Sequence, residues 1–291
     1  METGRASRTA LATAYARAHH QLSGEPRVFT DPLAARIIGL TADRMQEFET
    51  ERLDRPGGND PRRRARRYFL AARARLAEEV VAKAVAAGTR QVVILGAGLD
   101  TFGYRNPYPQ VRVFEVDHPD TQRWKHEMLA DSGIEIPESV TYAPVDFETG
   151  TLAAGLAAVG FRRDEPAVFV WLGVVMYLTR EAIVETLRFI ADQAPPVWVV
   201  ADYLGPGTTD EERAAVRERA ERIAALNEPF LSYLEPAEFD ELLRSLGFDT
   251  VEQWRLSELL AEYLEAPIPD LSLGGGPVRI MCASRGPATE D

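Results

Sequence analysis

The sequence predicts an α/β fold in which a mainly parallel sheet carries helices on both of its faces. Short apolar runs rich in β-branched residues, such as Val92–Leu95, alternate with longer segments of helical periodicity. The run at Val92–Leu95 leads directly into Gly96-Ala97-Gly98, and the next apolar run ends in Asp117. A strand, a glycine turn, a helix and a strand that ends in an acid are typical of Rossmann-like sheets that bind nucleosides.

The composition is that of a large globular protein. Its 291 residues, 45% of them hydrophobic, are enough to bury a full core. No apolar run approaches the roughly 20 residues that cross a bilayer, and the polar first residues do not resemble a signal peptide, so we expect a soluble cytoplasmic protein. The net charge of -12 argues against a nucleic acid or a membrane as the main partner. Cys282 and the four histidines show no metal-ligand spacing, so no metal is expected.

The region before the first strand predicts an N-terminal helical cap over residues 1–60. Residues 8–22 carry apolar side chains at helical spacing. A second helix is expected to begin at Asp31-Pro32, with Asp31 as its N-cap and Pro32 in the first helical position. Residues 61–291 then form the main domain, integrated with the cap into one unit.

A long helix is expected from about Pro61 to Ala87, with Gly88 as the residue that ends it. Several arginines crowd its first turns, and the acidity of the whole chain favours a solvated, salt-bridged face over a nucleic-acid patch. Arg73 lies deeper in the helix, among alanines, and close enough to the first strand to point over its carboxyl end. An arginine in this place could bind the carboxylate of a ligand.

Six further strands and four further helices are expected after the first strand. The strands are Val111–Asp117, Val140–Val145, Ala167–Leu172, Val197–Ala201, Phe248–Trp254 and Val278–Ala283. The helices are Pro119–Leu129, Thr179–Asp192, Thr209–Leu226 and one that follows Glu235-Pro236. The last two strands are expected to form an antiparallel pair at the edge of the sheet.

The glycine turn distinguishes two classes of nucleoside cofactor. A dinucleotide fingerprint needs a third glycine where this chain has Thr101. Asp100 places a negative charge at the turn, where it would repel a pyrophosphate but tolerate a cationic amino-acid tail. S-adenosylmethionine has such a tail, no phosphate, and ribose hydroxyls that could donate to Asp117. The residues therefore favour methyl transfer, with an NAD-dependent oxidoreductase or a non-catalytic cofactor-binding scaffold as alternatives.

An acid and an aromatic residue, Asp146 and Phe147, follow the predicted strand at Val140–Val145. A carboxylate at a strand end could accept a hydrogen bond from the amine of an adenine, and a ring could pack on the purine. Packing alone explains Phe147 equally well.

Five strings occur along the chain in the order RARLAEE, VVILGAGLDT, VFEVDHPDTQRWK, APVDF and WLGVVMYLT. Together they resemble the leucine carboxyl methyltransferase family, over roughly Thr9 to Ala283. The likeness is strongest to its bacterial branch of S-adenosylmethionine-dependent methyltransferases, which includes O-methyltransferases of aromatic polyketide pathways such as tetracenomycin. The resemblance implies a class I methyltransferase fold, with a seven-stranded, mainly parallel sheet and an N-terminal helical lid.

The resemblance also implies roles for individual residues. Gly96, Ala97 and Gly98 would face the methionine portion of S-adenosylmethionine, and Asp117 would accept from the ribose hydroxyls. Asp146 and Phe147 would hold the adenine. Arg73 would pair with the methionine carboxylate.

Tyr177 matches the tyrosine in the family's segment after the fourth strand. In many members, the protein-modifying ones included, this segment begins with a glutamate, where the present chain has Leu172. This difference argues against a phosphatase C-terminus as substrate. The expected methyl acceptor is therefore a small molecule.

The expected reaction is transfer of a methyl group to a carboxylate or a hydroxyl. A carboxylate needs no general base, whereas a phenol must lose its proton. Tyr177, His19 and His20 are the candidate catalytic residues, and His118 is expected to pack beside the cofactor. No catalytic role is assigned to any of them from the sequence.

Overall fold

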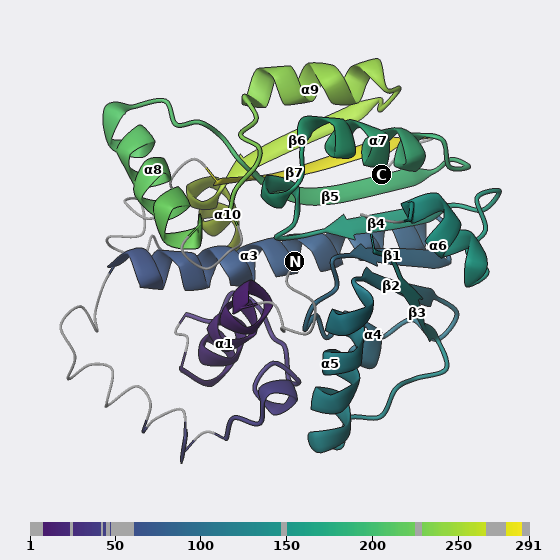
Figure 1. Cartoon of the computed structure of the whole chain (residues 1–291), viewed down its shortest axis with the longest axis horizontal. Coiled ribbons are helices and arrows are strands. Elements are labelled where there is room, and N and C mark those ends of the chain that lie inside the picture. The colour runs from purple at the N-terminus through teal and green to yellow at the C-terminus, as the bar shows by residue number, and fades with distance from the viewer. Residues whose placement is uncertain are drawn as a thin grey trace.

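The apolar runs of the sequence pair into one sheet in the computed structural model (Figure 1). The structure describes residues 8–23, 26–41, 43–44, 47, 61–146, 150–224, 229–265 and 278–286. The strands in this part of the chain are β1 (Gln91–Leu95), β2 (Arg112–Asp117), β3 (Val140–Pro144), β4 (Ala167–Trp171), β5 (Val197–Leu204), β6 (Thr250–Arg255) and β7 (Val278–Arg285). They form a seven-stranded sheet in the order β3-β2-β1-β4-β5-β7-β6.

Strands β1 to β5 pair with one another in parallel, and β7 runs antiparallel to both β5 and β6. The central strands β1 and β4 are buried along their whole length, which explains why their sequences are continuous apolar runs. The seven-stranded, mainly parallel sheet predicted from the sequence is confirmed. So is the antiparallel pair at its edge, with β6 as the last strand.

The helices in the described part of the chain are α1 (Arg8–Ser23), α3 (Pro61–Ala86), α4 (Phe102–Arg105), α5 (Pro119–Asp131), α6 (Leu152–Ala158), α7 (Arg180–Ala191), α8 (Asp210–Ala224), α9 (Pro236–Ser245) and α10 (Leu256–Tyr263), with 3-10 turns η1 (Arg36–Ile38) and η2 (Val175–Tyr177). Helices α1, α3, α5, α7, α8 and α9 lie at predicted positions, whereas α4, α6 and α10 were not predicted from the sequence. None of the described helices is both long and apolar enough to span a membrane.

Alternate residues of β1 enter two different cores. Val92 and Ile94 pack in the core that contains the apolar residues of α3 and α10. Val93 and Leu95 pack in the core that contains those of α6, α7 and α9. Because successive strand residues point to opposite faces, helices cover both faces of the sheet, as predicted. In Figure 1, α3 crosses the sheet on one side, and α7 and α9 lie on the other.

The N-terminal region differs from the prediction after its first helix. Helix α1 is present and packs against α3. The helix expected at Asp31-Pro32 is wrong: turns lead only into η1, which ends at Gly39 with φ 65. Asp31 does accept from the amide of Leu33, as an N-cap would, but its other oxygen accepts from Thr101 Oγ1 at 2.7 Å. The carboxylate is thus held by a distant residue. The boundary at residue 60 stays a prediction.

Candidate cofactor site

The candidate site lies where the strand order of the sheet reverses. From β1 the chain continues to β2 and β3 on one side, and then to β4 and β5 on the other. The carboxyl ends of parallel strands meet at one edge, and ligands of such sheets bind in the crevice at this reversal. The segments that follow β1, β2, β3 and β4 therefore gather the glycine turn, Asp117, Asp146 and Gly173 along one edge.

The glycine turn is closely covered by two other segments. Gly96 has φ 65, and an added Cβ would lie 2.3 Å from Val174 Cγ2 in the segment after β4. Gly98 has φ 44, and its Cβ would lie 3.2 Å from the Cβ of Ala10 in α1. Gly96 thus has no room for a side chain, and a side chain at Gly98 would press on the N-terminal helix, which lies directly over the turn.

We expect Gly96→Ala to lower the free energy of unfolding by roughly 2–4 kcal/mol, since it adds a steric clash to an unfavourable backbone conformation. Gly88→Ala is the matched control, because Gly88 has φ 99 but nothing within 4 Å of an added Cβ. Gly88→Ala should lower the free energy of unfolding by only the cost of the backbone conformation, about 1–2 kcal/mol. Urea denaturation of both variants measures the difference, and equal losses would contradict the clash.

Asp117 is held at the end of β2 by two backbone amides. Its Oδ2 accepts from the amide of Gly98 at 2.7 Å, and its Oδ1 accepts from the amide of His118 at 2.7 Å. Burial raises the pKa of Asp117, and these two amides act in the opposite direction. The side chain of Thr121 is a further donor to this carboxylate, and since a carboxylate accepts about four hydrogen bonds, roughly one place is left for a ligand hydroxyl. The structure therefore brings together the glycine turn and the acid that the sequence paired by spacing.

The predicted adenine residues lie at the next strand. Asp146 follows β3 and is half-buried, and its carbonyl accepts from the amide of Gly150 at 2.8 Å. Phe147 lies outside the described residues. His118 serves as the N-cap of α5, because its Nδ1 accepts from the amide of Asp120 at 3.2 Å.

Arg73 has a partner that the sequence did not indicate. Its Nη1 lies 2.5 Å from Oδ2 of Asp202 in β5, and both side chains are buried. The sequence predicts a fifth strand that ends at Ala201, one residue before Asp202, whereas β5 extends to Leu204. An acid inside the otherwise apolar run VWVVADYL was the available signal.

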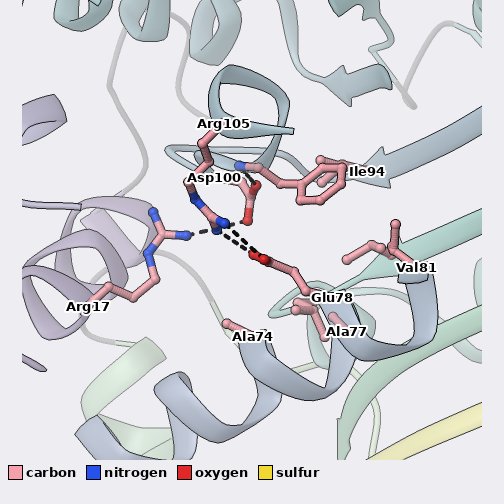
Figure 2. Close-up of a pocket in the computed structure, with 11 residues that line it drawn as sticks. Arg17, Ala74, Ala77, Glu78, Val81, Ile94, Asp100 and Arg105 are labelled. Atoms are coloured by element: carbon pink, nitrogen blue, oxygen red, sulfur yellow. Dashed lines mark hydrogen bonds and ion pairs between the residues drawn. The ribbon is translucent and has the colours of Figure 1, made fainter. Parts of the chain in front are cut away.

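A small pocket opens between α1, α3 and the carboxyl ends of β1 and β4. Figure 2 shows its charged side chains pointing toward one another, beside an apolar wall that includes Ile94. Arg17 Nη1 lies 3.4 Å from Asp100 Oδ2, and Arg105 Nη1 donates to Glu78 at 2.9 Å. Two arginines and two carboxylates thus form a paired, charged network beside the glycine turn.

The two carboxyl groups of this pocket titrate differently. Burial raises the pKa of Glu78, even though Arg105 opposes it. Burial also acts to raise the pKa of Asp100, but Arg17, Lys125 and Arg105, together with the amide of Phe102, outweigh it and lower the pKa. Asp100 therefore keeps its negative charge at the turn. This charge is what would repel the pyrophosphate of a dinucleotide.

Arg17 is a site residue that sequence reasoning missed. It lies on the buried side of α1, between Ala14 and Ala18, and its Nη2 donates to the carbonyl of Leu99 at 2.5 Å. A charged residue within an apolar helical stripe was the signal. Glu78 lies in the string RARLAEE, and Arg105 follows shortly after VVILGAGLDT. Nothing in the sequence indicates that these two residues form a pair.

The candidate catalytic residues are in different environments. Tyr177, in η2, is half-buried with its ring 5.4 Å from that of Phe230. His19 is half-buried, with its Nδ1 2.7 Å from Nη1 of Arg67.

His20 is 2% exposed, and its Nε2 accepts from the amide of Val28 at 3.1 Å. Burial, followed by the charges of Arg67 and Arg27, lowers its pKa to about 4. A neutral imidazole whose accepting nitrogen is occupied is poorly placed to remove a substrate proton. We therefore carry only Tyr177 and His19 forward as candidates.

We expect His20 to make the protein less stable as the pH falls from about 6.5 to about 4. In this window the unfolded chain binds a proton at His20 that the folded protein does not, so stability rises with pH. His20→Gln should flatten this part of the profile by up to about 3 kcal/mol. Urea denaturation across the pH range measures it, and parallel profiles for the two proteins would contradict it.

Comparisons with known proteins identify the family of the chain. The family model of leucine carboxyl methyltransferase matches residues 10–191. The Bacillus subtilis protein named "Putative S-adenosyl-L-methionine-dependent methyltransferase YktD" is 32% identical over 275 residues, which cover 85% of this chain and 88% of that protein. A relative of the same description from Mycobacterium tuberculosis is 31% identical over 277 residues, covering 88% of this chain and 87% of its own.

Two solved structures share the fold. A structure described as a "putative methyltransferase" from Thermobifida fusca has a TM-score of 0.56 at 16% identity, with 98% of this chain and 97% of that chain covered. A DUF574 family protein from Streptomyces avermitilis has a TM-score of 0.52 at 18% identity, with 94% and 97% covered.

The family match covers more than half of the chain, and the relatives align over most of their own length. The cofactor of this family is S-adenosylmethionine, as the glycine turn and the missing third glycine predict. The chain therefore belongs to the leucine carboxyl methyltransferase family and is an S-adenosylmethionine-dependent methyltransferase.

Proposed function

We propose that the protein transfers the methyl group of S-adenosylmethionine to an oxygen of a small molecule, either a carboxylate or a hydroxyl, in secondary metabolism. The observation that carries the cofactor site is the 2.7 Å hydrogen bond from the Gly98 amide to Asp117, at the reversal of the sheet. The resemblance to polyketide O-methyltransferases supports oxygen as the acceptor. Leu172, in place of an acid, supports a small molecule over a protein terminus.

The residues present fit the cofactor. The remaining accepting capacity of Asp117 suits a ribose hydroxyl, and Asp146 with Phe147 is proposed to hold the adenine. The carboxylate of the amino-acid end is proposed to lie on Arg73, whose chain neighbour Ala74 lines the charged pocket. When bound, S-adenosylmethionine supplies an electrophilic methyl group on a sulfonium.

The protein's own part in the reaction is then placement and exclusion of water. Helix α1 covers the glycine turn through Ala10, and Arg17 fixes α1 to the carbonyl of Leu99. A carboxylate acceptor would be favoured by a dry site, because opposite charges neutralise each other as the methyl group moves. A phenol acceptor would need a base, for which Tyr177 and His19 are the candidates.

Neither alternative function retains an observation in its favour. Membership of a methyltransferase family and the ionised Asp100 at the turn count against an NAD-dependent oxidoreductase. A scaffold without turnover would bind the cofactor but transfer no label.

The direct test is incubation with methyl-labelled S-adenosylmethionine and a small-molecule extract of the host cells, followed by mass spectrometry. Mild alkali then separates the two acceptor classes, since it releases methanol from a methyl ester but not from an aryl ether. Label on nitrogen or carbon, or on a protein, would contradict O-methylation of a small molecule. Titration calorimetry with S-adenosylhomocysteine is the accompanying binding test.

A further inference from the structure

Asp202 is a buried acid at the cofactor edge of the sheet to which the proposed mechanism gives no role. It lies in β5 and is 1% exposed. Its Oδ2 accepts from Nη1 of Arg73 at 2.5 Å, and its Oδ1 accepts from the amide of Gly173 at 2.5 Å. One carboxylate therefore joins helix α3 to the backbone that follows β4.

Gly173 allows the guanidinium of Arg73 to lie directly against this backbone. It has φ 76, and an added Cβ would lie 3.3 Å from Nη2 and 3.4 Å from Nη1 of Arg73. A side chain at this position would displace the guanidinium. The place of Arg73 is thus fixed by an acid on one strand and by a glycine after the neighbouring strand.

The charge balance shows what Asp202 contributes. Arg73 is 8% exposed, and a buried guanidinium without a counter-charge is strongly unfavourable. Asp202 supplies this charge and, of the donors of Arg73, accepts only from Nη1, which leaves the donors on Nη2 and Nε for a second acceptor. Since β4 lies next to β1, that acceptor would sit at the edge where the glycine turn lies.

We propose that Asp202 is a positioning residue, which holds Arg73 against Gly173 in the orientation that receives the carboxylate at the amino-acid end of the cofactor. This inference rests on the proposed role of Arg73. Asp202 itself does not touch the ligand. It acts by fixing the direction of the remaining guanidinium donors.

Two ligands separate this role from a merely structural one. S-adenosylhomocysteine and 5′-methylthioadenosine share the adenosine thioether, but only the first has the amino-acid carboxylate. We expect Asp202→Asn to weaken the affinity for S-adenosylhomocysteine by at least about tenfold. The affinity for 5′-methylthioadenosine should change by less than about threefold. Titration calorimetry on the full chain measures both constants. Asp164→Asn, at an acid whose side chain is 71% exposed, is the control and should change neither.

A second variant covers the case in which the single change impairs folding. Asp202→Asn leaves the charge of Arg73 buried without its partner, whereas Arg73→Met with Asp202→Asn removes both charges. We expect the double variant to recover thermal stability, to bind 5′-methylthioadenosine as the wild type does, and to bind S-adenosylhomocysteine no more weakly than Arg73→Met alone. This non-additivity is the signature of one residue acting through the other.

Equal losses for the two ligands, or additive losses in the double variant, would overturn the positioning role. An Arg73→Met variant that keeps its affinity for S-adenosylhomocysteine would overturn it together with the proposed role of Arg73. A wild-type protein that binds neither ligand would refute the proposed cofactor site itself. The outcomes therefore distinguish a failure of this inference from a failure of the proposed function.

Discussion

Asp117→Ala should abolish measurable binding of S-adenosylhomocysteine, with a loss in affinity of at least about 100-fold. A hydrogen bond to a charged group contributes roughly 1.5–3 kcal/mol, and the carboxylate would accept one from a ribose hydroxyl. The variant also leaves the amides of Gly98 and His118 without their acceptor, so the turn that faces the ligand loses its support. Titration calorimetry with S-adenosylhomocysteine is the measurement.

Two further variants separate binding from folding in this prediction. Asp117→Asn keeps an oxygen for one backbone amide but loses the charge, so we expect an intermediate loss of affinity. Asp164→Ala removes an exposed acid of the same type and should leave the affinity unchanged. Should Asp117→Ala bind within about threefold of the wild type, the ribose would have to be held elsewhere and the proposed site would be wrong.

The sequence predicts those parts of the site that lie within one strand-turn-helix-strand unit. Gly98 and Asp117 are 19 positions apart, and the glycine turn brings them to 2.7 Å as their spacing predicts. A buried parallel strand can also be predicted from a short stretch of sequence. Burial on both faces requires a continuous apolar run, as in β1. The fold class therefore follows from the sequence pattern alone.

The remaining site contacts join residues too far apart for any local pattern to indicate. Arg73 and Asp202 are 129 positions apart, and Arg17 is 82 positions from the Leu99 carbonyl that it binds. The same reason explains the wrong helix at Asp31, whose carboxylate is held by Thr101, 70 positions away. When the side chain of a capping residue binds a distant partner, its residue type no longer predicts that a helix begins there.

Lys125 and Glu115 form an ion pair whose disruption should be among the most destabilising single changes in the chain. Both side chains are 1% exposed, and Nζ lies 2.7 Å from Oε2. Glu115 lies two residues before Asp117 on β2, and Lys125 reaches it from α5, so the pair fixes the strand and helix on either side of the ribose acid. We expect Lys125→Met to lower the free energy of unfolding by about 3–5 kcal/mol, because it leaves a buried carboxylate uncompensated.

An exposed ion pair on the same helix serves as the control, because it differs from the Lys125–Glu115 pair mainly in its burial. Arg123 and Asp120 are 2.8 Å apart in α5, but the side chain of Arg123 is 66% exposed. Arg123→Met should therefore cost less than about 1 kcal/mol. Lys125→Met combined with Glu115→Gln should recover much of the lost stability, since no charge is then left in the core.

The pH dependence of Lys125→Met provides an independent check on this cause. Burial already raises the pKa of Glu115, and Lys125 opposes that shift, so loss of the lysine should raise the pKa further. An acid whose pKa is higher in the folded state than in the unfolded chain destabilises the fold as the pH rises above its unfolded value of 4.5. The penalty of Lys125→Met should therefore be largest near neutral pH and should shrink as the pH falls toward 4.5. A penalty that stays constant over this range, in urea denaturation of both proteins, would point to lost packing of the lysine stem instead of an uncompensated charge.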